Sequence, residues 1–417
     1  MARSPEQSAA GFREVPVTAL LRVDDDFVRD PFPRFDELRA QGPVHVLRTR
    51  DGARYWLVVG SEEIRSGLRD TRLSKDPDLL AAARVRQRCE HGVVDGPAAE
   101  AALRELTSFL RSFTYEVREV VKETLSGRHA ARHAPRVAAI ADELLDGLAA
   151  VSGPVDLVAS YSMPFATRVS GSLLGVAPDE LAEFGARVSA WLGSDSAEAR
   201  ATARRRVSAL LDELIAARCG READDVVSAL VGKAGTAGRE SLVRACLIFV
   251  MITVETVVSF LATAVHALLS HPEQLRLLRD EPERTGAAID ELLRFTGPHN
   301  VSAQRCATED LELGGQHIAE GDLVVFALGA ANHDAATYPD PHRLDLDRDA
   351  TGHLAFGAGR HYCPGTHQAR SALATGIAAL LRRYPGLRLA VPAGEVSWVP
   401  SELLRSVRAL PVHLAGG

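Results

Sequence analysis

The sequence is poor in cysteine and has no long uninterrupted apolar run. Its five cysteines are widely spread and include no C-x-x-C pair. A secreted disulfide-bonded scaffold is therefore excluded, and a reducing cytoplasm is the expected environment. The N-terminus lacks the apolar segment of a signal peptide, and the most apolar run, 245–254, is bounded by Arg244 and Glu255. Since a membrane span needs about 20 apolar residues, we expect no membrane anchor.

A basic excess is also missing. The sequence has 48 lysines and arginines and 55 acidic residues, so its net charge is −7. This charge argues against nucleic-acid binding. Nearly all basic residues are arginines, and we attribute this to the coding bias of a GC-rich genome; the lysines are Lys75, Lys122 and Lys233. A chain of 417 residues, 46% hydrophobic, can bury a large core without disulfides or a structural metal.

The pattern along the chain is mainly helical with a minor β portion. Strand-like runs occupy 44–47 and 55–59, and a long helix is expected over 239–270, where His271-Pro272 ends it. No repeat or flexible linker divides the sequence. We therefore predict one domain over 1–417, with a β-rich part at about 40–60, a helical body at about 97–295, a special loop at 356–365 and a helix at about 367–383.

The sharpest local signal is the segment Phe356–Gly365, F-G-A-G-R-H-Y-C-P-G, just ahead of a predicted helix. Gly357 and Gly359 can adopt positive φ and let backbone approach closely. A cysteine at a helix N-terminus has a lowered pKa, so Cys363 suits a thiolate metal ligand. We favour haem iron, because a single thiolate ligand below a haem promotes O–O cleavage.

Three other interpretations of this segment remain open. A lone buried cysteine is most often a small hydrophobic residue. A glycine-rich turn can bind phosphate, but no G-K-[ST] and no clear preceding strand are present. A zinc site is conceivable, although its spacing matches no usual structural-zinc pattern; its ligands would be His353, His361, Cys363 and His367.

The segment resembles the haem-binding signature of cytochrome P-450 enzymes, F-G-x-G-x-H-x-C-x-G followed by x-x-x-A-R. The matching positions are Phe356, Gly357, Gly359, His361, Cys363, Gly365, Ala369 and Arg370. Further segments that resemble motifs of the family occur in the right order over almost the whole chain: 30–39, Glu255-Thr256, the E-x-x-R pair Glu291 and Arg294, Arg305, 331–334 and 339–348. The resemblance implies the P-450 fold, with haem b between a long central helix and the cysteine-ligand loop.

The resemblance also implies roles for the cofactor-binding residues. Cys363 would be the axial ligand of the haem iron, and Arg305 and His361 would donate to the two haem carboxylates. Arg104 aligns with the arginine of an H-x-x-x-R carboxylate-binding motif, although an ordinary exposed helical arginine fits as well. The loop residues Phe356, Gly357 and Gly365 complete the predicted haem-binding set.

The remaining candidate residues are catalytic or structural. By resemblance, Glu255 and Thr256 deliver protons during oxygen activation, which is general acid chemistry; a threonine that bonds to its own helix carbonyl is the alternative. Thr253 stands where the family has glycine, and we expect it to crowd the oxygen groove and alter oxygen handling. Glu291 and Arg294 would tie their helix to the segment before the cysteine loop, whereas an isolated pair would be a solvated salt bridge.

Two further departures concern the haem surroundings. Glu100 replaces the carboxylate-binding histidine of the H-x-x-x-R motif, and an anion there would repel a carboxylate unless it points away. His367-Gln368 stands where the family has an apolar residue, so packing behind the haem is expected to differ.

The expected function is that of a soluble bacterial monooxygenase that uses O2 to hydroxylate a small organic substrate in secondary-metabolite biosynthesis. Ferredoxin and ferredoxin reductase would supply electrons. The alternatives are an atypical outcome, such as oxidative coupling, desaturation or rearrangement, and a non-catalytic haem-binding protein. The pocket is expected to draw on the loop 76–94, helices within 160–200, 249–255, 299–304 and the turn at 401–402. Asn300, Ser302 and Gln304 suggest a substrate with polar groups.

Overall fold

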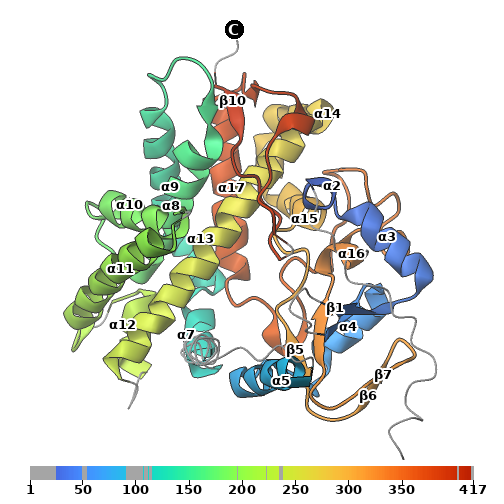
Figure 1. Ribbon diagram of the computed structural model, residues 1–417. Coiled ribbons are helices and arrows are strands. Elements are labelled where there is room, and N and C mark those ends of the chain that lie inside the picture. The colour runs from blue at the N-terminus through green and yellow to red at the C-terminus, as the bar shows by residue number, and fades with distance from the viewer. Residues whose placement is uncertain are drawn as a thin grey trace, which may run out of the picture.

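The computed structural model describes residues 25–48, 54–90, 107, 111, 115–194, 196–221, 223–233, 238–401 and 403–414. Helices dominate and short strands make up a minor part (Figure 1), which confirms the predicted fold class. The helices are α2 (Asp25–Arg29), α3 (Phe32–Gln41), α4 (Ser61–Arg69), α5 (Pro77–Glu90), α7 (Tyr115–Thr124), α8 (Gly127–Gly147), α9 (Met163–Leu174), α10 (Leu181–Leu192), α11 (Ala197–Arg218), α12 (Val226–Lys233), α13 (Arg239–Ser270), α14 (Pro272–Asp280), α15 (Thr285–Thr296), α16 (Leu328–Asn332) and α17 (Thr366–Arg383).

Helix α13 runs diagonally through the middle of the molecule, and α17 packs beside it (Figure 1). Its bounds agree with the sequence-based prediction, because Gly238 lies at its N-cap and Pro272 cannot continue its hydrogen bonding. It packs against α9, α11, α15 and α17. Its length and apolarity would suffice to cross a membrane, but 67% of its most apolar window is buried inside the fold. This burial is that of a core helix.

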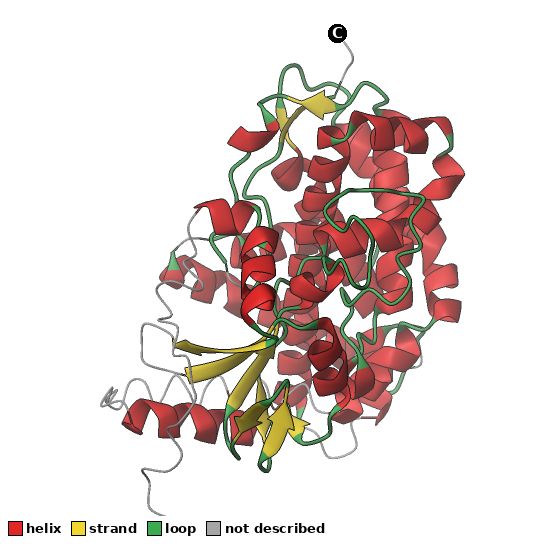
Figure 2. Ribbon diagram, turned by 90° about the vertical axis from the view of Figure 1, so that its right-hand side faces the viewer, coloured by secondary structure: helices red, strands yellow, loops and turns green. Residues whose placement is uncertain are grey.

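The strands of the largest sheet lie at one end of the molecule, in the lower part of Figure 2, and a smaller group of strands lies at the opposite end, at the top. The largest sheet has the order β1-β2-β8-β5-β3, in which β2 and β8 are parallel and the other pairs antiparallel. Its strands are β1 (Val44–Arg48), β2 (Arg54–Val58), β3 (Leu73–Ser74), β5 (Arg305–Ala307) and β8 (Leu323–Phe326). The smaller sheets comprise β4 (Val155–Asp156), β9 (Arg388–Leu389) and β10 (Pro411–His413), and β6 (Leu311–Leu313) with β7 (Gln316–Ile318).

The hydrophobic core is divided between the helical part and the large sheet. The largest cluster of buried apolar side chains lies among the helices, from α7 to α17, and includes most of α13. Three smaller clusters lie around the large sheet. The polar site residues described below lie on α13 and α15, on β5 at the sheet, and on the segment that leads into α17.

One element differs from the prediction. The expected loop at 76–94 begins as the helix α5, which covers Pro77–Glu90. The carboxylate of Asp76 accepts hydrogen bonds from the amides of Asp78 and Leu79, so Asp76 caps the first turn, and proline follows it at the first helical position. Both signals are visible in the sequence. Residues 91–94 lie outside the described residues.

Candidate active site

The cysteine loop, defined here as residues 354–365, is a compact turn held by its own backbone. The amide of Cys363 donates to the carbonyl of Phe356 at 3.0 Å, and that of Tyr362 to the carbonyl of Gly359 at 3.0 Å. Gly357 and Gly359 both have φ of +70°, as their predicted conformational role requires. A Cβ atom on Gly359 would lie 2.6 Å from the carbonyl oxygen of Leu68, so the loop packs directly against the end of α4.

Cys363 lies just before α17, and its thiol is free. Its carbonyl accepts a hydrogen bond from the Thr366 hydroxyl at 2.8 Å. Burial raises the pKa of the Cys363 thiol, although the amide of Gly365 and the charge of Arg118 oppose this shift. The predicted net lowering by the helix N-terminus is therefore wrong for the protein without metal, because desolvation outweighs the favourable donors. A bound metal ion would itself deprotonate the thiol.

A polar contact group that the sequence analysis missed supports the cysteine loop from behind. Asp290 of α15 accepts from Arg370 of α17 at 2.6 Å and lies 3.2 Å from the ring of His353. Burial alone would raise the pKa of Asp290, but the bonds to His353 and Arg370 outweigh it and hold the pKa below its usual value. The Arg370 guanidinium also lies 4.8 Å from the ring centre of Phe356. Arg370 thus fixes both ends of the loop to α15.

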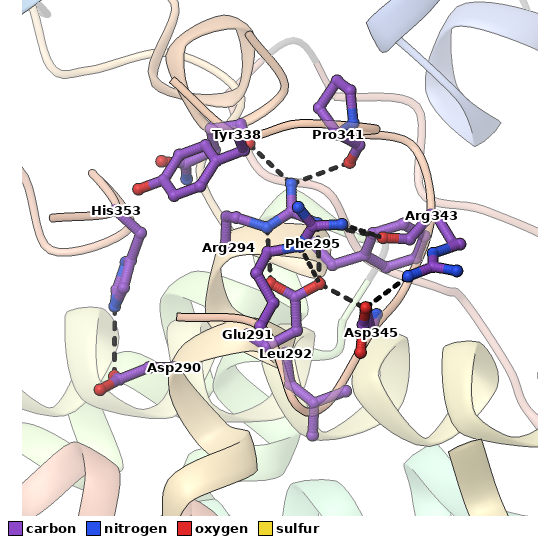
Figure 3. A network of polar contacts seen from close by, with 12 residues as sticks. Asp290, Glu291, Leu292, Arg294, Phe295, Tyr338, Pro341, Arg343, Asp345 and His353 are labelled. Atoms are coloured by element: carbon purple, nitrogen blue, oxygen red, sulfur yellow. Dashed lines mark hydrogen bonds and ion pairs between the residues drawn. The ribbon is translucent and has the colours of Figure 1, made fainter. Parts of the chain in front are cut away.

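The E-x-x-R pair is buried, not solvated. Glu291 and Arg294 are each 1% exposed and are joined by two hydrogen bonds of 2.6 and 2.8 Å. Arg294 also donates to the carbonyls of Asn332 and Pro341, both at 2.8 Å, and Glu291 accepts from the amide of Asp345 at 3.1 Å. Figure 3 shows how these contacts join α15 to the segment around 341–345. The pair therefore connects α15 with the chain that precedes the cysteine loop.

Arg305, at the start of β5, is 1% exposed. Its Nη1 donates to the Leu68 carbonyl at 3.1 Å, whereas its Nε has no hydrogen-bond partner among the described residues. Burial lowers the pKa of Arg305 to about 10. In the cysteine loop, burial and the nearby charges of Lys75 and Arg305 lower the pKa of His361 to about 3, so its imidazole is neutral. Positive charge therefore accumulates near this loop without an acidic partner for Arg305.

These features fit a haem. A carboxylate would satisfy the unpaired Nε of Arg305, since a buried guanidinium normally binds an anion. Ile252 of α13 and Tyr362 of the cysteine loop are 47% and 42% exposed, unusual values for large apolar side chains on these two elements. An apolar macrocycle with two carboxylates between the long helix and the loop would cover such side chains and supply the anions.

On α13, Thr256 and Glu255 occupy the predicted positions in the long helix. The Thr256 hydroxyl donates to the carbonyl of Ile252 at 2.7 Å, which is the helix-carbonyl bond considered as the alternative to a catalytic contact. Burial raises the pKa of Glu255, and the charge of Arg200 on α11 partly opposes the shift. A carboxyl group that holds a proton more tightly than usual is suited to deliver it near neutral pH.

The Thr253 hydroxyl takes part in hydrogen bonds within α13 and toward α9. It donates to the Phe249 carbonyl at 2.7 Å and lies 2.9 Å from the hydroxyl of Ser170 on α9. Because Thr253 donates its single hydroxyl hydrogen to the Phe249 carbonyl, the Ser170 hydroxyl donates to the Thr253 oxygen. This group therefore joins α13 to α9, and the expected effect of Thr253 on oxygen handling stays a prediction.

The predicted polar pocket lining is largely engaged in internal bonds. The Ser302 hydroxyl accepts from the Phe326 amide at 3.1 Å, and Gln304 accepts from Arg84 of α5 at 3.0 Å. Only the side-chain amide nitrogen of Asn300 has no partner among the described residues of this segment. The polar composition thus reflects packing of the sheet region more than substrate contacts.

Some predictions lie outside the described residues, namely Arg104, Glu100 and Glu402. Behind the cysteine loop, Gln368 is 4% exposed, and neither polar atom of its side chain has a partner in the described part of the chain. Among those residues, no three histidine, cysteine, aspartate or glutamate side chains are placed to share a metal ion. The zinc alternative therefore has no support there.

Comparison with known proteins agrees with this geometry. The family model described as "Cytochrome P450" matches residues 196–388. The cytochrome P450 monooxygenase PikC of Streptomyces venezuelae is 35% identical, over 96% of this chain and 95% of its own. The 6-deoxyerythronolide B hydroxylase of Saccharopolyspora erythraea is also 35% identical, over 94% of this chain and 98% of its own.

Among solved structures, cytochrome P450 MoxA from Nonomuraea recticatena has a TM-score of 0.82 at 31% identity, and the match covers 95% of this chain and 98% of that one. Both the fold and the nearly full-length sequence matches point to one family, whose members use a haem-thiolate cofactor. The chain belongs to the cytochrome P450 family and is a monooxygenase that inserts one oxygen atom of O2 into a small organic substrate, as related bacterial enzymes of secondary metabolism do.

Proposed function

We propose that this enzyme hydroxylates a small organic substrate in bacterial secondary metabolism and that its cofactor is haem b. The observation that carries the cofactor assignment is the free Cys363 in a loop packed against the end of α4, where Arg305 has an unpaired buried nitrogen. The reaction type rests on the relatives, one of which is named as a hydroxylase of 6-deoxyerythronolide B.

The residues divide the work as follows. When bound, the haem supplies oxygen activation and transfer, with Cys363 as its iron ligand. Arg305 and His361 would hold its carboxylates, and Phe356, Gly357 and Gly365 would shape the cysteine loop that receives it. Arg104 would hold a carboxylate in the same way. Together these groups would hold the cofactor in one orientation.

Proton delivery falls to α13. Glu255 holds its proton more tightly than an exposed glutamate does, because it is partly buried. Thr256 is the next residue, and its hydroxyl can exchange the Ile252 carbonyl for a water or substrate group. We assign Thr253 to the same machinery as a positioning residue, since its hydroxyl holds α13 against Ser170.

We further propose that the whole chain forms one catalytic domain, that it works in the cytoplasm, and that ferredoxin and ferredoxin reductase donate the electrons. The support is that the family matches extend over more than nine-tenths of the chain. The burial of α13 in the core also agrees with a protein outside the membrane.

The first test is the absorption spectrum of the reduced protein with carbon monoxide. Thiolate ligation by Cys363 predicts the long-wavelength Soret band, and Cys363→His should abolish it while Cys219→Ser, which changes an exposed free cysteine, should keep it. A shorter-wavelength band in the unmodified protein would contradict thiolate ligation.

The second test follows the oxygen atom. With surrogate redox proteins, labelled O2 and 6-deoxyerythronolide B as a probe substrate, hydroxylation predicts one labelled oxygen in the product. A product without label would instead support coupling or desaturation. Oxidation of NAD(P)H without any product would favour a haem-binding protein without turnover on this substrate class.

A further inference from the structure

The sheet register places a second cation next to Arg305. Strands β3 and β5 are antiparallel, with Ser74 opposite Cys306 and Leu73 opposite Ala307. Lys75 directly follows the last paired residue of β3, and Arg305 directly precedes its partner on β5, so one further step of the register would set the two side by side. Residues opposite each other in antiparallel strands have Cβ atoms about 5 Å apart on the same face of the sheet. Two like charges at such positions destabilise the sheet unless an anion lies between or above them.

Neither cation has an acidic partner in the described part of the chain. Arg305 donates only to the neutral carbonyls of Gly67 and Leu68, and its Nε is unpaired. Asp70, which directly follows α4, accepts hydrogen bonds from Arg72 with both of its carboxylate oxygens. Lys75 forms no ion pair within the described residues. Leaving a buried charge without a partner is costly, so the arrangement calls for an anionic ligand.

The Lys75 side chain is half-buried, and its surroundings are cationic. Burial, with the charges of Arg305 and Arg118, lowers the pKa of Lys75 to about 8. Its charge also acts on His299, where burial and Lys75 lower the pKa of the imidazole to about 4. These charge effects agree with the register, which brings Lys75 close to Arg305.

We propose that Lys75 is a haem-binding residue that pairs with a haem carboxylate beside Arg305. This inference rests on the haem cofactor of the proposed function and adds a ligand that no sequence motif indicates. It also accounts for the sequence departure at position 100, where glutamate replaces a carboxylate-binding histidine: Lys75 supplies the missing positive partner from a different element. Lys75 is one of only three lysines in a chain whose other basic residues are arginines.

The test measures how fast the substrate-free, haem-loaded protein loses haem to excess apomyoglobin. Lys75→Met should release haem at least about tenfold faster, because a hydrogen bond between charged groups is stronger than one between neutral groups. Lys75→Arg should retain the unmodified rate within about threefold. The matched control is Lys122→Met, which removes an exposed lysine on α7; its rate should stay within about twofold.

A second readout is independent of haem release. The midpoint potential of the iron should shift in Lys75→Met and not in Lys122→Met, an exposed lysine on α7. Unfolding of the haem-free variants by urea checks that Lys75→Met folds normally; if it does not, Lys75→Gln replaces it.

Unchanged haem release and potential in Lys75→Met would overturn the proposal. If that variant instead lost only the spin-state response to a carboxylate probe such as laurate, Lys75 would serve a substrate carboxylate. Failure of the haem assignment itself is distinct, because the unmodified protein would then bind no haem.

Discussion

Gly359 illustrates how a single atom can decide the shape of the cysteine loop. Gly357 and Gly359 share the same φ of +70°, but only Gly359 faces a neighbouring backbone, the Leu68 carbonyl. Gly357→Ala should cost about 1–2 kcal/mol, the penalty of left-handed backbone for an alanine. Gly359→Ala should cost clearly more, because the new methyl group also displaces α4. Urea unfolding of the two variants measures the difference, and equal losses would show that the contact with α4 does not matter.

Glu255 gives the stability of the protein a specific pH dependence. Burial raises its pKa above the unfolded value, so the folded state binds the proton more tightly. The free energy of unfolding must then fall as pH rises through the interval between the two pKa values. Glu255→Gln should be more stable than the unmodified protein at pH 8, and this advantage should shrink at pH 5. The control Glu240→Gln alters an exposed glutamate of the same helix and should show no such trend.

The same substitution should lower turnover by about 10²-fold, the lower end of the range for a lost general acid. Glu255→Asp should recover part of it, since a shorter carboxyl group can still donate through a water. Retention of full coupled turnover in Glu255→Gln would remove this residue from the proton route.

At the scale of elements, the buried pair Glu291 and Arg294 determines where α15 lies. Arg294→Met leaves a carboxylate buried without its partner and should cost roughly 3–5 kcal/mol. Arg284 offers a matched control close to the same helix, because its ion pairs with Glu281 and Asp347 are largely exposed. Arg284→Met should cost no more than about 1 kcal/mol. Similar denaturation midpoints for both variants would contradict the structural role of the buried pair.

The elements also show what the sequence could predict. Helix α13 could be predicted from its apolar run and from the proline after it. Helix α17 begins one residue before its predicted start. Phe356, His361 and Cys363 stand in a motif, so their places could be expected. These features depend on residues that are neighbours in sequence.

The features that could not be predicted from the sequence depend on contacts between segments that are distant in the chain. The partner of Thr253 is Ser170, on another helix, and no spacing rule links the two. The support of the cysteine loop by Asp290 is equally non-local. The pKa of Cys363 was misjudged because the helix N-terminus is visible in sequence, whereas burial is not. The helix α5 is the exception, since its cap and proline were present and overlooked.

The whole molecule should respond to removal of its cofactor. Arg305 is buried with an unpaired nitrogen, so haem binding should stabilise the fold through mass action as well as through contacts. At a free haem concentration 100 times the dissociation constant, the gain is about 2.7 kcal/mol. Calorimetry should find a higher melting temperature for the reconstituted protein than for the haem-free protein. An identical transition in both would show that haem binds without coupling to the fold.

The parallel pairing of β2 with β8 has a consequence for biosynthesis. Trp56 on β2 bonds to Asp322, which lies 266 residues later in the chain. At translation rates of about 5–20 residues per second, the partner strand emerges roughly 10–50 s after β2. During that time the β1–β2 hairpin, marginal on its own, carries an open strand edge on the ribosome. Soluble yield in a foreign host should therefore depend on the chaperones that cover this edge during elongation, more than on the stability of the finished enzyme.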